Sequence, residues 1–320
     1  MNSCTSCTST STASFQTAVE SGRQNKRRTL QASFFLLFVF APVFDIFRYD
    51  LTLDHFILFG HAWTLGLDPL LAGQGSSTEA VLNIILRGFL PLLGILFLFG
   101  WTSWKYGRLY CGWLCPHFSV VETINALMRK ASGKLSIWDK KKSTHQADGK
   151  QIEVNNQYWI LVVIAVLGFS FLWAVSLLTY LLPPKEIYYN LLHFSLTRNQ
   201  LLFIGVATLL LSIEFTFARH LFCRFGCAVG VFQSLVWMGN KRAMVVSFDR
   251  GNASQCQGCH NVCDEICPMR LKPRSIKRSM FTCTECGQCL TACEQVQERK
   301  SMPAILTWQD GQSALQESDR

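Results

Sequence analysis

Residues 256–293 read CQGCHNVCDEICPMRLKPRSIKRSMFTCTECGQCLTAC and hold eight of the fourteen cysteines in the chain. The cysteines form two runs. The first, Cys256 to Cys267, has the spacing C-x₂-C-x₃-C-x₃-C, and the second, Cys283 to Cys293, has C-x₂-C-x₂-C-x₃-C. A cubane [4Fe–4S] cluster needs four thiolates around one small volume, and a tight loop can supply three of them. The stretch therefore predicts a small iron–sulfur module.

The two runs are expected to interlock, so that each cluster takes three cysteines from one run and the last cysteine of the other, as in bacterial two-cluster ferredoxins. On this rule the ligands of cluster 1 are Cys256, Cys259, Cys263 and Cys293, and those of cluster 2 are Cys283, Cys286, Cys289 and Cys267. Such clusters move single electrons. The chain is therefore predicted to be a redox conduit.

Disulfides and zinc sites are the alternatives for these cysteines. Disulfides do not suit a cytosolic segment, because thiols there are kept reduced. Zinc could fill two Cys₄ sites, although zinc has no need of an interlocked triplet-plus-one pattern. The first run has one residue more than the usual spacing but keeps Pro268, whereas Glu294 stands where the second run would have proline. His260, inside the first run, is read as a loop residue.

The rest of the chain is typical of a membrane protein. Of its 320 residues 49% are apolar and only 16% are charged. A bilayer core of about 30 Å takes about 20 helical residues, and residues 30–47, 81–101, 158–182 and 201–221 are apolar enough to qualify. The expected fold is an all-α integral membrane protein, with four transmembrane helices in two repeated pairs and a small ferredoxin-like module.

Lysine and arginine are concentrated before the first span, between the second and third, and after the fourth. The positive-inside rule then places both termini and the iron–sulfur module in the cytoplasm, at a bacterial inner membrane. The net charge of +9 is therefore interpreted as a signal of topology, and nucleic acid is not an expected partner.

Four regions are expected. Residues 1–25 should form a disordered tail, in which Cys4 and Cys7 are incidental thiols, and residues 26–250 the transmembrane domain. Residues 251–300 should form the 2[4Fe–4S] module, and residues 301–320 a flexible tail.

The membrane half contains an internal repeat with an offset of 112 residues, which aligns two C-x₃-C motifs: Cys111 and Cys115 in the first copy, Cys223 and Cys227 in the second. Cysteines four apart share a helix face, and both pairs follow a span at its predicted cytoplasmic end, so the four sulfurs are expected to meet. Arg108, Arg219 and Arg224 would favour the thiolates. Copper(I), an iron–sulfur centre and a reversible dithiol all suit such ligands.

The combination of spans, C-x₃-C motifs and ferredoxin runs resembles the NapH/MauN-type membrane ferredoxins, over roughly residues 25–300. It is also similar to the CcoG/FixG/RdxA proteins and to the C-terminal half of NosR. Pro116 fits the family motif C-x₃-C-P, whereas Ala228 replaces that proline in the second copy. The resemblance implies electron transfer between the quinone pool, the clusters and a redox partner. NapH-type relatives imply quinol oxidation, and CcoG-type relatives imply copper handling during oxidase assembly.

Three functions follow as hypotheses. The first is a quinol-linked electron-transfer subunit, with quinol dehydrogenase activity as its enzymatic form. Polar residues at the outer side are the candidates for its quinone site: His55, His61, Asp54, Asp68 and His193. The second is a copper-reducing assembly factor for a respiratory or methylamine-utilising metalloenzyme, with copper at the C-x₃-C cysteines. The third is a membrane scaffold stabilised by zinc.

Overall fold

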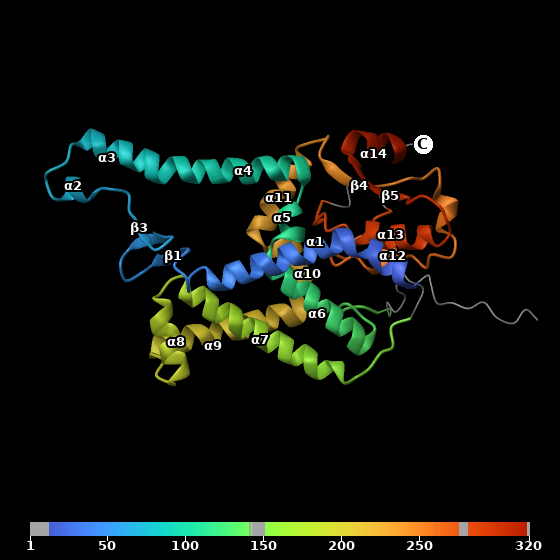
Figure 1. Cartoon of the computed structure of the whole chain (residues 1–320), viewed down its shortest axis with the longest axis horizontal. Coiled ribbons are helices and arrows are strands. Elements are labelled where there is room, and N and C mark those ends of the chain that lie inside the picture. Colours follow the sequence, from blue (N-terminus) through green and yellow to red (C-terminus); the bar gives the residue numbers. More distant parts are fainter. Residues whose placement is uncertain (1–12, 141, 143–150, 275–280, 319–320) are drawn as a thin grey trace, which may run out of the picture.

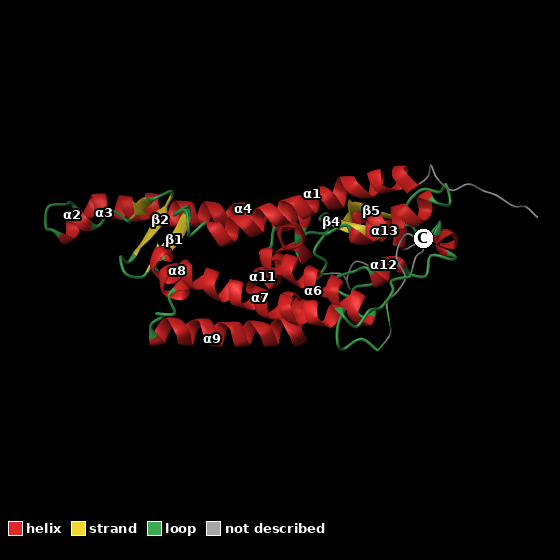
Figure 2. Ribbon diagram, turned by 60° about the horizontal axis from the view of Figure 1, so that its bottom comes forward, coloured by secondary structure: helices red, strands yellow, loops and turns green. Residues whose placement is uncertain are grey.

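The computed structural model describes residues 13–140, 142, 151–274 and 281–318 of the chain. The molecule is elongated, and its long helices run along the longest axis (Figure 1). A small β-sheet lies at one end of these helices and the cysteine-rich module lies at the other, an arrangement that the rotated view also shows (Figure 2). Cys4 and Cys7 lie outside the described residues.

The long helices of the bundle are α1 (Ala13–Phe40), α4 (Leu90–Tyr106), α7 (Tyr158–Thr179) and α9 (Arg198–Ile213). Among the described residues, three helical stretches are long and apolar enough to cross a membrane: Ser77–Tyr106, Tyr158–Thr179 and Arg198–Met238. They overlap the expected spans 81–101, 158–182 and 201–221. Their outer faces carry exposed leucine, isoleucine and phenylalanine side chains, as expected for helices in contact with lipid.

The expected span 30–47 is helical only as far as Phe40. Helix α1 ends at Phe40, a turn follows, and a strand begins at Phe47. Pro42 lacks the backbone N–H that would continue the helix, which explains the early end. The apolar part of α1 is then about 11 residues, or about 16 Å, which is shorter than a typical span. The whole helix nevertheless runs from the cysteine-rich module to the small sheet, alongside the other long helices (Figure 1). The same helix also covers residues 13–25, the larger part of the expected tail.

The end of the bundle opposite the cysteine-rich module, which we call the outer end, is not helical throughout, and this corrects the all-α expectation. Strands β1 (Phe47–Asp50), β2 (His55–Leu58) and β3 (His61–Trp63) form an antiparallel sheet in the order β1-β2-β3. The short helices α2 (Asp68–Leu71) and α3 (Ser77–Asn83) follow, and the π-helical turn η1 (Ile84–Phe89) leads into α4. Ser76 caps α3 in a capping box with Glu79. Helix α8 (Pro184–Leu192) lies at the same end (Figure 1).

The C-terminal residues are folded. Strand β5 (Leu306–Asp310) pairs antiparallel with β4 (Met244–Phe248), with Trp308 opposite Val246, and α14 (Gly311–Ser318) follows it. The flexible tail expected at 301–320 is therefore wrong for the described part of that segment. Apolar residues at Ile305, Leu306 and Trp308 explain this, because they supply a strand that can pack on the module. The module also contains the short helix η4 (Ala253–Cys256), with α12 (Val262–Glu265) and α13 (Gln288–Glu298).

The sequence repeat is also a repeat of backbone conformation. After α4 the chain turns at Gly107, where φ is 65°, and its counterpart Arg219 also has a positive φ, of 21°. The first copy continues through α5 (Leu109–Trp113) into α6 (Pro116–Ser132). The second runs from α9 through η2 (Glu214–Ala218), α10 (Arg219–Leu221) and η3 (Phe222–Gly226) into α11 (Ala228–Met238). Cys115 and Cys227 are both extended, with ψ of 116° and 113°.

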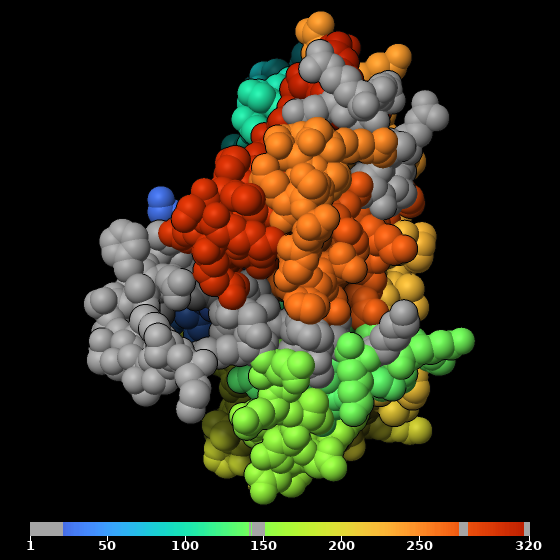
Figure 3. Space-filling model, turned by 90° about the vertical axis from the view of Figure 1, so that its right-hand side faces the viewer, coloured from blue at the N-terminus to red at the C-terminus, as the bar shows by residue number. Residues whose placement is uncertain are grey.

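The two halves share one hydrophobic core. Buried side chains of the bundle, such as Val166 and Phe215, belong to the same cluster as Cys223, Leu290 and Leu306. The end-on view in Figure 3 shows the C-terminal residues, in orange and red, on the same face as green residues of the bundle. The cysteine-rich module is thus built onto the inner end of the membrane bundle. Among the described residues, the two parts pack directly on each other.

Candidate functional site

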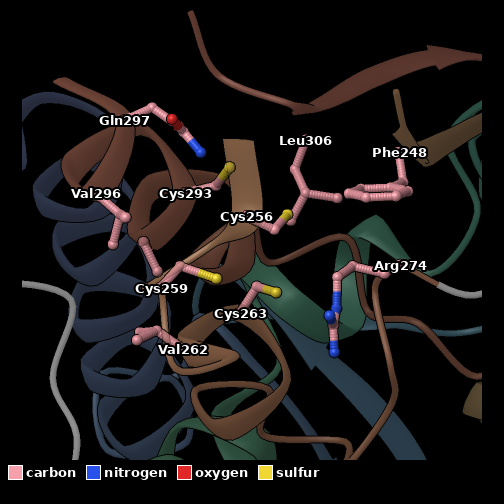
Figure 4. A pocket seen from close by; sticks show the side chains of 11 residues that line it. Phe248, Cys256, Cys259, Val262, Cys263, Arg274, Cys293, Val296, Gln297 and Leu306 are labelled. Atoms are coloured by element: carbon pink, nitrogen blue, oxygen red, sulfur yellow. The ribbon is translucent and has the colours of Figure 1, made fainter. Parts of the chain in front are cut away.

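One cavity of the module is lined by Cys256, Cys259, Cys263 and Cys293, together with apolar side chains that include Leu306 (Figure 4). Three of these cysteines come from the loop around α12 and the fourth from α13. Arg274 also lines the cavity and forms an ion pair with Asp264 at 2.6 Å. Four thiols around one small, largely apolar space match the donor set of a [4Fe–4S] cluster. We call these four cysteines the outer set.

A second cavity is lined by Cys267, Cys283, Cys286 and Cys289, which we call the inner set. All four are buried, whereas three cysteines of the outer set are partly exposed. The backbone N–H of Leu271 donates to the sulfur of Cys267 at 3.4 Å. The structure therefore brings together the same two groups of four that the interlocked sequence pattern predicts, and each group again has the donors that a cluster needs.

The extra residue in the first run is absorbed by its backbone. His260 and Asn261 both adopt left-handed conformations, with φ of 49° and 57°, between Cys259 and Cys263. In the second run Gly287 alone does so between the corresponding cysteines, with φ of 69°. Asparagine tolerates this region better than most residues, so the added residue causes little backbone strain at Asn261. The missing proline at Glu294 has a different result: α13 continues unbroken past Cys293, and Glu294 pairs with Arg23 at 3.0 Å.

The thiols of the module are strongly desolvated. Burial raises the pKa of Cys263 and that of Cys286 to about 12, and Arg27 opposes the shift at Cys286. Burial likewise raises the pKa of Cys283 and of Cys289. A metal centre bound here must displace these protons, and its own positive charge then stabilises the thiolates.

A third cavity, of about 260 Å³, lies in the membrane half and is lined by all four cysteines of the C-x₃-C motifs. The repeat therefore brings the two pairs together across the bundle. The expectation that each pair shares one helix is wrong, however. Cys111 belongs to α5 and Cys223 to η3, while Cys115 and Cys227 are extended residues that precede α6 and α11. π-Helical turns such as η3 are frequent at functional sites.

Arg108 connects this cavity to the module. It lines the cavity, its side chain is buried, and it donates to the carbonyl of Cys223 at 2.6 Å and to that of Thr282 at 3.4 Å. Its Nη2 also lies 3.8 Å from the sulfur of Cys111. The other two basic residues that were expected to act on these thiols, Arg219 and Arg224, do not line the cavity. Arg219 instead donates to Asn125 of α6.

His117 is a residue of this cavity that the sequence did not reveal. Its Nε2 lies 3.3 Å from Oε1 of Glu214, and its ring stacks on Phe215. Glu214 was noted in the sequence only as a charge that is costly in a span. It lies inside the bundle beside His117, and among the described residues neither of its carboxylate oxygens has a hydrogen-bond partner. The residues expected at a quinone site lie elsewhere. His55, His61, Asp54, Asp68 and His193 are at the outer end, and none of them lines the four-cysteine cavity.

A polar network ties α1 to the inner set. Arg27 is buried, and it donates to Glu122 of α6 at 2.8 Å and to the carbonyl of Gly112 at 3.0 Å. Gln24 donates to the carbonyl of Cys286 at 3.2 Å. Burial lowers the pKa of Arg27, but the Glu122 carboxylate outweighs this effect and the pKa is raised. The sequence had identified the basic residues before the first span only as topology signals, since a buried and a solvated arginine look alike in a charge pattern.

Comparison with known proteins supports this description. A family profile described as "4Fe-4S binding domain" matches residues 87–134 and 199–243, which are the two repeats with their C-x₃-C motifs. The chain is 26% identical to the ferredoxin-type protein NapH of Haemophilus influenzae, over 84% of this chain and 86% of that protein. It is 26% identical to the protein RdxA of Cereibacter sphaeroides, over 68% of this chain and 46% of RdxA.

The chain is also 24% identical to YccM of Escherichia coli, over 70% of this chain. It spans about half of the length of YccM and RdxA, 56% and 46% respectively. No solved structure matches significantly. The similarity to these proteins and to the 4Fe-4S profile confirms the resemblance drawn from the motifs, and with it an iron–sulfur electron-transfer protein of the membrane.

Proposed function

Because this chain is a membrane ferredoxin of the NapH/RdxA type, we propose that it passes electrons from the membrane quinol pool through two [4Fe–4S] clusters to a redox partner. The observation that carries the proposal is the division of eight cysteines into two sets of four around neighbouring cavities. The outer set would hold cluster 1 and the inner set cluster 2. Each cluster, when bound, accepts and returns one electron at a time.

The difference in burial between the two sets suggests the order in which electrons pass through the clusters. The inner set is buried on the side of the module that packs against the membrane bundle. The outer set is partly exposed, beside the exposed residues Gln257, Gly258 and His260. Electrons from the membrane would therefore reach the inner set first and leave through the outer set. A redox partner would dock over the exposed loop. We propose that this end faces the cytoplasm of a bacterial inner membrane, because basic residues flank the spans on this side.

A quinol gives up two electrons and two protons, so its hydroxyl groups need a polar partner inside apolar walls. The four-cysteine cavity offers both: Trp173, Leu177 and Leu211 line it, and Leu177 is also exposed on the outside of the bundle. We propose that His117, held beside Glu214, hydrogen-bonds a quinol hydroxyl there. This replaces the outer-end residues as the candidate quinone contact.

The test is anaerobic purification in detergent, followed by iron and sulfide analysis and EPR before and after a quinol analogue is added. We expect interacting reduced-cluster signals with dithionite, and partial reduction with the quinol. Iron without any response to quinol would remove the quinol from the proposal. Zinc in place of iron would end the electron-transfer proposal, since Zn²⁺ is d¹⁰ and has no redox chemistry.

His117→Gln tests the proposed contact within the same experiment, with His193→Gln at the exposed outer end as its control. We expect the first variant to need roughly tenfold more quinol for the same reduction, because a hydrogen bond in a buried site is worth about 1–2 kcal/mol. Dithionite reduction should be unchanged in both variants. Equal quinol titrations for the two would contradict a role for His117.

One observation favours a second candidate. Thiols from both repeats surround a single cavity, and soft thiolates suit copper(I). A copper-reducing factor would bind copper there and lose it on substitution of Cys111 or Cys223 by serine, with the iron content of the module intact. Unchanged copper stoichiometry in these variants would exclude this function.

A further inference from the structure

Arg108 is a buried positive charge to which the proposed function gives no role. It lines the four-cysteine cavity with only 1% of its surface exposed, and it takes part in none of the ion pairs between described residues. A guanidinium out of water without a counter-ion is costly, because it has lost its hydration and gained no opposite charge. An anion in the cavity beside it would remove this cost.

The contacts of Arg108 leave one of its N–H groups free for a ligand. Its Nη1 donates to the carbonyl of Thr282 at 3.4 Å, and its Nη2 to that of Cys223 at 2.6 Å. Its Nε has no hydrogen-bond partner among the described residues. The sulfur of Cys111 lies 3.8 Å from Nη2, but Cys111 donates its own S–H to Oε1 of Gln233 at 2.9 Å. Cys111 is therefore a neutral thiol and does not balance the charge.

The fold holds this guanidinium at one place on the cavity wall. Arg108 follows the turn at Gly107, just beyond the apolar stretch Ser77–Tyr106, and so lies at the end of the bundle that carries the module. A Cβ on Gly230 of α11 would lie 2.3 Å from Nη2 of Arg108, so the absence of a side chain there leaves room for the guanidinium. A cation fixed in this way is suited to binding an anion of the cavity.

We propose that Arg108 binds the oxygen of the quinol ring that becomes negatively charged when the substrate loses its first proton, an inference that rests on the proposed quinol function. The O–H bond of one hydroxyl breaks, its proton passes by way of His117 to the carboxylate of Glu214, and the bonding electron pair stays on the ring oxygen. The free Nε–H of Arg108 donates to that oxygen. Neither carboxylate oxygen of Glu214 has a hydrogen-bond partner among the described residues, which leaves it open to the proton.

Arg108 also contacts the side of the cavity where the electron acceptor lies. Thr282, whose carbonyl accepts from Nη1, directly precedes Cys283 of the inner set. A charge-assisted hydrogen bond is about twice as strong as a neutral one, so Arg108 favours the anion over the neutral quinol. The anion gives up an electron more readily than the neutral quinol. One electron leaves it and one arrives at the one-electron acceptor of the inner set, and the second proton and electron follow to leave the quinone.

Two quinone analogues test directly whether the site prefers a negatively charged oxygen. Hydroxynaphthoquinone has an acidic hydroxyl and is an anion at neutral pH, whereas its methyl ether has the same rings and is neutral. Isothermal titration calorimetry measures the binding of both to the intact protein in detergent, with a detergent blank subtracted. We expect the protein to prefer the anion, and Arg108→Gln to reduce that preference roughly tenfold, because one charge-assisted hydrogen bond is lost.

Two further variants separate the charge of Arg108 from its effect on packing. Arg108→Lys keeps the positive charge and should keep most of the preference for the anion. Arg219→Gln removes an equally buried arginine that does not line the cavity, and it should change neither affinity. Uptake of the two compounds by detergent is the same in every sample, so it cancels when the variants are compared.

An unchanged preference in Arg108→Gln would overturn the proposal, and so would a parent protein that binds the ether as tightly as the anion. The result for the parent protein decides even if the glutamine variant does not fold. Binding of both compounds without any dependence on Arg108 would leave the quinol function standing. Binding of neither compound would instead contradict the quinol site, and the anion site with it.

Discussion

At Gly112 the backbone of the membrane half lies in close contact with the backbone of the cysteine-rich module. The Cα of Gly112 faces the backbone of the inner loop, and no side chain fits between them. The residue has no positive φ that would require glycine, so the requirement is one of space. The sequence shows only a glycine inside a C-x₃-C motif, and its role follows from the partner that the fold places against it.

Gly112→Ala should separate these two surfaces. Overpacking at such a contact costs about 1–3 kcal/mol, so we expect a lower Tm in detergent and slower quinol-driven reduction. The iron content should be unchanged. Gly168→Ala is the matched control, because nothing lies within 4 Å of a Cβ placed on Gly168 in α7. If both variants behave like the parent protein, the contact is not important for stability or electron transfer.

Arg27 and Arg28 are adjacent in sequence but have different environments. Arg27 is buried between Glu122 and the carbonyl of Gly112, whereas Arg28 is exposed. Arg27→Gln leaves Glu122 without its ionic partner, and breaking a buried pair costs about 3 kcal/mol. We therefore expect a clearly lower Tm for Arg27→Gln and almost no change in Tm for Arg28→Gln, measured by thermal unfolding in detergent. Equal effects would mean that the two arginines act only through their charge.

At the scale of elements, the C-terminal strand and helix complete the module. Leu306 of β5 lines the cavity of the outer set, and Trp308 donates to Glu285, between two cysteines of the inner set, at 2.7 Å. Strand β5 therefore contacts the cavity of the outer set and the loop that carries the inner set. Helix α1 has a similar role on the other side, since it packs against both α6 and α13.

A chain that ends at Ser301 lacks β5 and α14. It should lose most of the iron bound by the module, because β4 then has no partner strand and the outer cavity loses one wall. A chain that ends at Ser318 keeps both elements and serves as the control. Iron analysis after purification makes the comparison. Full iron content in the shorter chain would show that residues 302–320 are dispensable for the module.

The two ends of the molecule differ: a small sheet lies at one end of the bundle and the cysteine-rich module at the other (Figure 1). If the spans cross the membrane as proposed, Gln74 and Gln312 face opposite compartments. Both are exposed. We expect an impermeant maleimide to label Gln74→Cys in intact cells and Gln312→Cys only after permeabilisation, with the parent chain as background. The reverse pattern would invert the topology.

Much of the site could be predicted from the sequence, because cluster ligands are closely spaced within a loop. The grouping of Cys256, Cys259 and Cys263 with Cys293, and the pairing of two C-x₃-C motifs, follow from spacing and from an offset of 112 residues. Three of the four expected spans follow from uninterrupted apolar length. The bounds of the first expected span were wrong, since Pro42 ends the helix at Phe40 and its polar first half was not recognised as helical.

By itself the sequence determined what each segment can do locally: bind iron and sulfide through clustered thiols, or span lipid through apolar helices. Only the tertiary structure decided which residues from distant segments meet. Four contacts of this kind each join residues 58 or more positions apart: Arg108 with Cys223, Arg27 with Glu122, Gly112 with Thr284, and β4 with β5. Such contacts depend on how faces pack in three dimensions, and a linear pattern of residue types carries no record of that packing.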